Sequence, residues 1–93
     1  MKIEGNTIIF KSTPDNYSKE LRGVKCNTVR RFVFYSEIKS FELFYEAWLA
    51  NNDLIDFKIC IIDTHTRGQF FRTITDISEY DGMFIFSWRY ENV

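Results

Sequence analysis

The stretch GVKCNTVRR, residues 23–31, carries the strongest local signals in this 93-residue chain. Gly23 is typical of a residue that ends a helix, and a connection containing Lys25 leads from it into a predicted strand. Side chains two residues apart on a strand share a face, so Thr28 and Arg30 should project together. An ammonium, a hydroxyl and a guanidinium at the entry of one strand predict a site for an anion or a nucleobase.

The residues before this stretch predict a strand and a short helix. Residues 2–11 alternate weakly and read as the first strand. A short helix then runs from Pro14 to Gly23, and Tyr17 and Leu21, four residues apart, should face the core. Residues 27–35 are strongly β-prone and form the second predicted strand. Thr28 and Arg30 lie on one face of that strand and Val29 and Arg31 on the other, and either face is compatible with the core.

The residues after it predict a longer helix and an antiparallel meander. Residues 36–52 read as the main helix, with apolar side chains at helical spacing: Ile38, Phe41, Tyr45, Trp48 and Leu49. Strands are expected at 57–63, 69–77 and 83–90, separated by turn signals at 64–68 and 80–82. The order β-α-β-α-β-β-β predicts a single α+β domain over residues 1–93. We expect about five strands curled into a small mixed β-barrel with two helices covering it.

The composition is that of a globular protein with a small core. Hydrophobic residues make up 45% of the chain and charged residues 27%, which argues against disorder. Aromatic residues reach 18%, ten of them Phe, and such rings bury much apolar area in a short chain. The net charge is −1, so no global field draws the protein to nucleic acid. Residues 1–40 nevertheless hold eight basic and four acidic side chains, which would form a local basic patch wherever they cluster in space.

Cysteine and histidine usage argues against a metal centre. Cys26 and Cys60 lie far apart without C-x-x-C spacing, and one His with two Cys makes no zinc ligand set. We therefore expect neither a metal nor another cofactor. The chain shows no signal peptide and no apolar run long enough to span a membrane, which favours a cytoplasmic protein with reduced thiols. The sequence carries no signal for the oligomeric state.

Two motifs resemble a known family. The spacing G-x-K-x-x-T-x-R at residues 23–30 resembles the signature of ASCH domains, small PUA-like β-barrels linked to RNA and modified nucleosides. Small uncharacterised phage and prophage proteins are also similar, with K-x-N-T-V-R at 25–30 and F-x-R-x-I-T-D-I at 70–77. The more usual ASCH motif has Glu where this chain has Thr28, although Thr occurs in a hydrolase branch. The resemblance spans most of the chain.

The resemblance implies binding of single-stranded RNA or a nucleotide. The expected ligand-binding residues are Lys25, Thr28, Arg30, Arg72 and Trp88. Lysine and arginine suit phosphate groups, and an aromatic ring suits stacking on a base.

Two alternatives belong to different functional classes. The hydrolase branch deacetylates N4-acetylcytidine, which implies Lys25 and Thr28 as catalytic residues with Asp76, or else Glu79, as the acid. The second alternative is a non-catalytic interaction module, which predicts an exposed aromatic patch from Phe41, Phe44 and Trp48.

Overall fold

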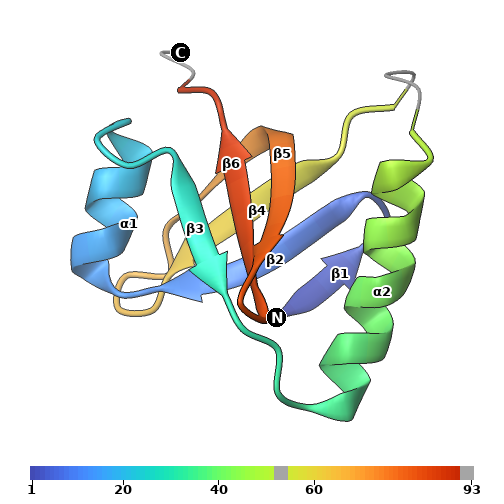
Figure 1. Cartoon of the computed structure of the whole chain (residues 1–93). Coiled ribbons are helices and arrows are strands. Elements are labelled where there is room, and N and C mark those ends of the chain that lie inside the picture. Colours follow the sequence, from blue (N-terminus) through green and yellow to red (C-terminus); the bar gives the residue numbers. More distant parts are fainter. Residues whose placement is uncertain (52–54, 91–93) are drawn as a thin grey trace.

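The computed structural model describes residues 1–51 and 55–90, which form one six-stranded sheet and two helices. Figure 1 shows these elements, and the bounds of the strands and helices follow here. They are β1 (Lys2–Glu4), β2 (Thr7–Ser12), α1 (Pro14–Leu21), β3 (Asn27–Arg30), α2 (Tyr35–Leu49), β4 (Lys58–Asp63), β5 (Gln69–Tyr80) and β6 (Met83–Trp88). The predicted α+β class and the two helices are confirmed.

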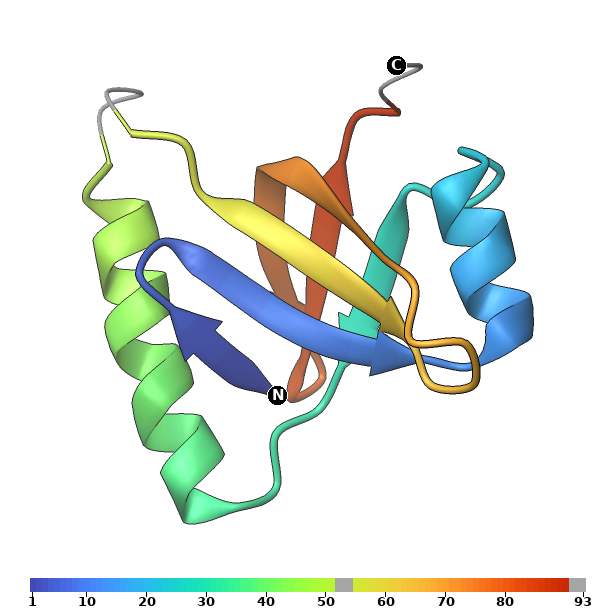
Figure 2. The same ribbon diagram turned by 180° about the vertical axis from the view of Figure 1, so that it is seen from behind.

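The sheet runs in the order β1-β2-β4-β5-β6-β3 and is open, not closed into the expected barrel. Only β2 and β4 are parallel, with Ile8 opposite Ile59, and every other neighbouring pair is antiparallel. Figure 2 shows β2 and β4 side by side with β1 at the outer edge. The two edge strands are β1 and β3, and no backbone ladder joins them.

The described residues form six strands and not five, because the first predicted strand is a hairpin. Gly5 has φ +58°, a conformation that glycine adopts at no steric cost, and it reverses the chain between β1 and β2. Glu4 therefore pairs with Thr7 across the turn. The predicted meander of three C-terminal strands is confirmed as β4, β5 and β6.

β3 is shorter than predicted because its partner, β6, does not extend alongside residues 31–34. It pairs only with β6, from Asn27 opposite Ser87 to Arg30 opposite Phe84. β6 begins at Met83, directly after a turn at Asp81, so no strand continues alongside residues 31–34. The chain leaves the sheet there and enters α2 at Tyr35, a residue that we had expected to end the strand.

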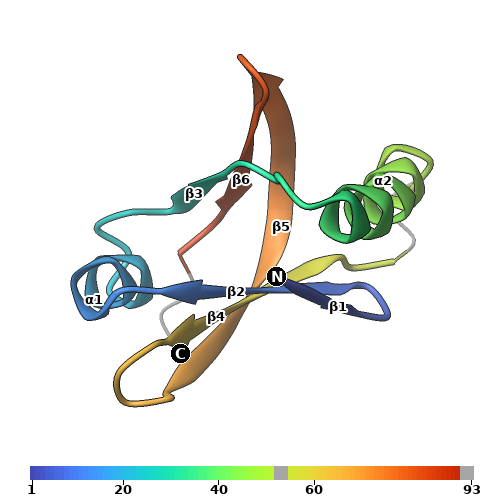
Figure 3. The ribbon, with the colours of Figure 1, turned by 90° about the horizontal axis from the view of Figure 1, so that it is seen from below.

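The two helices lie at opposite ends of the molecule, as Figure 3 shows from below. α2 buries Phe41 and Phe44 among the core residues of the sheet, so these two residues do not form the exposed aromatic patch of the interaction hypothesis. Its third candidate, Trp48, is half-buried. α2 ends at Leu49, earlier than expected, and residue 52 lies outside the described residues. No helix in the described part of the chain is long and apolar enough to cross a membrane.

α1 buries a charged side chain and exposes an apolar one. Thr13 caps its start by accepting a hydrogen bond from the amide of Asn16, and Pro14 occupies the first turn. Leu21, which we expected in the core, is 39% exposed. Glu20 instead points inward and has no exposed surface. The helix therefore places a carboxyl group against the sheet.

Candidate ligand site beneath the first helix

Thr28 and Arg30 turn toward the inside of the sheet, which settles the face that the sequence left open. Thr28 is 3% exposed and its neighbour Val29 is 48% exposed. Opposite residues in paired strands share a face, so Thr28 lies with Phe86 of β6 and Ile77 of β5, both buried. The two polar side chains of β3 thus enter a largely apolar interior.

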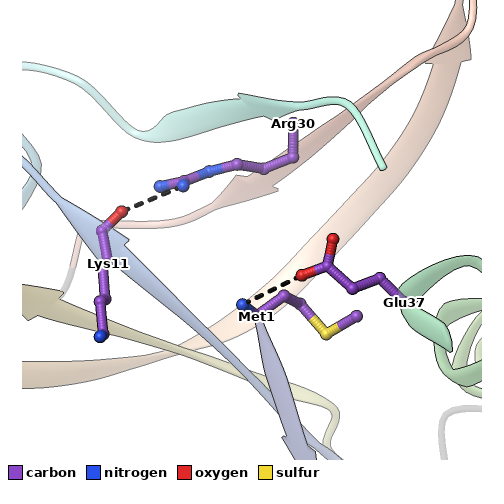
Figure 4. Close-up of polar contacts among 4 residues, drawn as sticks. All are labelled: Met1, Lys11, Arg30 and Glu37. Atoms are coloured by element: carbon purple, nitrogen blue, oxygen red, sulfur yellow. Dashed lines mark hydrogen bonds and ion pairs between the residues drawn. The ribbon is translucent and has the colours of Figure 1, made fainter. Parts of the chain in front are cut away.

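Arg30 connects β3 to the far end of β2. Its Nε donates to Thr28 Oγ1 at 3.0 Å, its Nη1 to the carbonyl of Lys11 at 3.0 Å and its Nη2 to Ser12 Oγ at 3.2 Å. Figure 4 shows the guanidinium reaching across to Lys11. The guanidinium also lies 4.5 Å from the centroid of the Phe10 ring. The side chain of Arg30 thereby joins β2 and β3, which have no backbone pairing with each other. Most of its N–H donors already make hydrogen bonds within the protein.

A second link shown in Figure 4 joins the other edge strand to the second helix. The amino group of Met1 lies 3.4 Å from Glu37 Oε2 on α2. This ion pair shares no residue with the hydrogen bonds that Arg30 makes to Thr28, Lys11 and Ser12.

Glu20 completes a buried polar chain. Ser12 Oγ accepts from Arg30 and donates to Glu20 Oε1 at 2.9 Å, so α1, β2 and β3 share one hydrogen-bonded series. Burial raises the pKa of Glu20 above its usual range, against the hydrogen bond from Ser12 and the positive charges of Lys25 and Arg30. Burial also lowers the pKa of Arg30, and the carboxylate of Glu20 opposes that change. The carboxyl group is therefore easier to protonate than one in water.

Three buried side-chain atoms have no hydrogen-bond partner among the described residues. They are Glu20 Oε2, Arg72 Nε and Trp88 Nε1. Their side chains are 0%, 8% and 4% exposed, so bulk solvent does not reach them. An unpaired buried polar group costs about 1–3 kcal/mol, and native proteins contain few. One acceptor and two donors therefore lack a hydrogen-bond partner within the described part of the protein.

Arg72 and Trp88 belong to the layer that α1 covers. Arg72 Nη2 donates to the carbonyl of Leu21 at 3.4 Å, and its guanidinium lies 4.7 Å from the centroid of Phe70. Trp88 packs edge-on against the same Phe70 ring, with centroids 6.5 Å apart. The amide of Trp88 donates to the carbonyl of Cys26 in the loop after α1. Both predicted ligand residues thus border the segment that carries Lys25.

Lys25 lies at the rim of this layer. It is half-buried in the loop that follows α1, and its amide donates to the carbonyl of Lys19 at 3.1 Å. Its positive charge lowers the pKa of Glu20, against the larger effect of burial, which raises it. Lys25 forms no ion pair with any residue in the described ranges. An uncommitted ammonium group beside a buried polar cluster suits a phosphate at the entrance.

The two residues that we considered as the acid of the hydrolase hypothesis, Asp76 and Glu79, lie away from Thr28. Asp76 is opposite Ser87, which is opposite Asn27, so Asp76 points to the other face of the sheet from Thr28. It is exposed and accepts a hydrogen bond from Ser78 at 2.9 Å. Glu79 shares the inner face but is exposed and lines a cavity beside α2. Glu20 is the acid that the structure brings to this site.

Sequence reasoning missed Glu20 and Ser12. Glu20 follows Tyr17 by three residues, so it lies on the helical face that Tyr17 turns toward Phe70. That spacing was the available signal, and the apolar Leu21 one position later obscured it. Ser12 has no sequence signal, because a serine at a strand end is ordinarily solvated.

No group of three or more His, Cys, Asp or Glu within residues 1–51 and 55–90 is arranged to hold a metal ion. Comparison of the chain with protein-family models, curated proteins and solved structures finds no match. Function is therefore inferred from the residues of the site, since function depends on a site more than on a fold.

Proposed function

We propose that this protein binds a nucleotide, free or within single-stranded RNA, in the polar layer beneath α1. The observation that carries the proposal is the set of three buried, unpaired atoms, Glu20 Oε2, Arg72 Nε and Trp88 Nε1. The edge of a nucleobase offers both donors and acceptors, so it can pair with such a mixed set. The G-x-K-x-x-T-x-R resemblance to ASCH domains supports the same assignment.

Four of the five predicted ligand residues have a role in this proposal. Lys25 contacts a phosphate, while Arg72 and Trp88 donate to the base. Arg30 acts indirectly, because its hydrogen bonds hold Thr28 and Ser12 in place. The three atoms are buried, so this proposal includes an opening of the protein around them when a base binds.

The test is a titration of a labelled short single-stranded RNA and a panel of nucleotides at low and rising salt. Phosphate contacts release counterions, so affinity should fall as salt increases. Lys25→Ala should weaken binding and lower the salt slope by about one. Lys58→Ala is the matched control, because Lys58 is exposed on β4. Absence of binding at low salt, or equal effects of the two variants, would refute the proposal.

Two tryptophan substitutions test the contact with the base separately from the contact with phosphate. Trp88→Phe keeps an aromatic ring but removes the indole N–H, so affinity should drop several-fold, corresponding to about 1 kcal/mol for one hydrogen bond. Trp48→Phe is the control, because Trp48 lies on α2, away from this layer. If both substitutions leave affinity unchanged, Trp88 has only a packing role.

An amidohydrolase acting on an acylated nucleobase is the second candidate. The observation that favours it is Glu20, a carboxyl with a raised pKa connected through Ser12 and Arg30 to Thr28. Thr28 would attack the acyl carbon, Lys25 would take the hydroxyl proton, and the carboxyl of Glu20 would protonate the departing amine. Water would then release the acyl group from Thr28.

Incubation with N4-acetylcytidine tests this second candidate. Turnover should be lost in Lys25→Ala, Thr28→Val and Glu20→Gln and retained in Asp76→Asn, because Asp76 points to the opposite face. A wild-type protein that binds the nucleoside without releasing acetate would leave the binding proposal standing and exclude the enzyme.

A further inference from the structure

A cavity of about 380 Å³ lies at the other end of the molecule, beside α2. Four aromatic rings line it, from Phe32, Phe41, Tyr45 and Phe84. Two carboxylates, Glu42 and Glu79, also belong to its lining, and no Lys, Arg or His does. None of these residues takes part in the polar layer beneath α1.

The four aromatic rings form the floor and the walls of this cavity. Phe41 is buried and forms the floor, with ring centroids 4.5 Å from Phe84 and 4.7 Å from Phe32. Tyr45 and Phe84 meet at 71° with centroids 5.6 Å apart, so their planes make a corner. Phe32, Tyr45 and Phe84 are half-buried, which leaves part of each ring accessible from the cavity.

The charge at the rim is negative. Glu79 on β5 is exposed and forms no ion pair with any described residue. Glu42 is 3.7 Å from Lys39 one turn earlier on α2, and both side chains are more than half exposed. An exposed pair of this kind is weak and is readily replaced by another cation. Aromatic faces attract cations within about 6 Å of the ring centroid, and carboxylates add Coulomb attraction.

We infer that this cavity binds an alkylammonium group. The aromatic corner receives the methyl or methylene surface of the cation, and Glu42 and Glu79 face its charge. An anionic ligand is disfavoured by the two carboxylates, and a purely apolar ligand gains nothing from them. Two sources carry this chemistry, a free quaternary amine and a lysine-type side chain of a partner protein.

The test is an NMR titration that follows the ring signals of Tyr45 and Phe84. The probes are choline, its uncharged carbon isostere dimethylbutanol, and two matched peptides containing either lysine or trimethyllysine. Choline should shift these signals and bind about tenfold more tightly than dimethylbutanol, because the charge supplies the added attraction. Tighter binding of the trimethyllysine peptide than of choline identifies a protein side chain as the source, and the reverse order identifies a free amine.

Two substitutions distinguish the contribution of the aromatic rings to binding from that of the carboxylates. Tyr45→Leu keeps apolar volume but removes the π face, and Glu79→Gln removes one charge without touching the core. Each should weaken choline binding by roughly three- to thirtyfold. Their controls are Tyr80→Leu and Glu46→Gln, exposed residues outside the cavity lining. Lys39→Ala should strengthen binding, because it removes the internal cation that competes for Glu42.

Three results would overturn the inference. They are equal affinity for choline and dimethylbutanol, ring signals that do not move with any probe, and a Glu79→Gln variant that binds as tightly as wild type. Glu79 is exposed, so its substitution keeps the test decisive even if Tyr45→Leu does not fold.

Discussion

Ser12 donates a hydrogen bond of 2.9 Å to Glu20, joining the end of β2 to the buried side of α1. The same serine hydroxyl accepts from Arg30 of β3 at 3.2 Å. One hydroxyl therefore connects a carboxyl and a guanidinium, the most costly groups to bury. This chain of polar contacts holds together the part of the molecule where the sheet has no backbone ladder between β2 and β3.

Arg30→Ala should lower the free energy of unfolding by about 2–4 kcal/mol, because it removes three hydrogen bonds of a charged group. Urea unfolding followed by circular dichroism measures the change. Arg31→Ala is the matched control, since Arg31 is exposed and donates one bond, to the carbonyl of Asp81 at 3.3 Å. Similar losses in the two variants would show that Arg30 does not connect β3 to β2.

Glu20→Gln should change how stability depends on pH. Burial raises the pKa of Glu20 above the unfolded value of 4.5, so the folded state binds more protons than the unfolded chain above that pH. The wild-type free energy of unfolding should therefore fall as pH rises from about 4.5 through the folded pKa of Glu20. Glu20→Gln removes this decline, so the stability of the variant relative to wild type should increase as pH rises from about 4.5 through the folded pKa of Glu20.

The control for this experiment is Glu46→Gln, a substitution at an exposed position of α2. Its stability should run parallel to that of wild type over the same pH range. A Glu20→Gln profile that also runs parallel to wild type would contradict the raised pKa of Glu20.

The stability that Asp63 contributes should depend on pH in the opposite direction to that of Glu20. Its carboxylate accepts from the amide of His65 at 2.9 Å and from the hydroxyl of Thr66 at 3.0 Å, holding the turn between β4 and β5. The hydrogen bond from the His65 amide is the main reason that the pKa of Asp63 lies below its ordinary value of 3.8. The stabilisation is therefore fully present above about pH 3.8 and is lost as pH falls through the folded pKa.

Asp63→Ala should consequently be less stable than wild type at neutral pH, with a difference that shrinks in acid. Asp56→Ala is the control, because Asp56 is exposed and precedes β4. Acid titration of the unfolding midpoint measures both variants. A difference that stays constant with pH would exclude a role for the ionised carboxylate.

Gly23→Ala tests the tight packing of the loop that carries Lys25. Gly23 has φ +79°, and an added Cβ would collide with the ring of Tyr90. Gly5→Ala is the matched control, since Gly5 has φ +58° with no atom within 4 Å of an added Cβ. The backbone strain should cost about 1–2 kcal/mol in each variant, with a further 1–3 kcal/mol from overpacking at Gly23.

Thermal unfolding of both glycine variants compares the two costs. Adding Tyr90→Ala to Gly23→Ala should recover the overpacking part and leave the backbone part. Equal destabilisation by the two single variants would show that the Tyr90 ring moves away from the added Cβ without a measurable cost in stability.

Local patterns predicted much of the fold. The alternation and turn signals after residue 57 predicted three consecutive antiparallel strands, because neighbouring strands need only a short turn to pair. The spacing of Thr28 and Arg30 predicted their shared face, because the pleat of a strand alternates its side chains. The hairpin at Gly5 went unpredicted, since a short edge strand carries little apolar alternation.

What the sequence determined by itself is therefore the class of the fold, its helices, its C-terminal meander and the joint position of Thr28 and Arg30. Only the tertiary structure decided that Thr28 and Arg30 face inward, that β3 stops at Arg30 and that Glu20 is buried. Each of these depends on segments distant in sequence. β3 ends opposite the first residues of β6, and Glu20 is tolerated inside because Ser12, Arg30 and Lys25 lie near it. Local propensity acts within a few residues, whereas the burial of a charge is decided by the partners that folding brings to it.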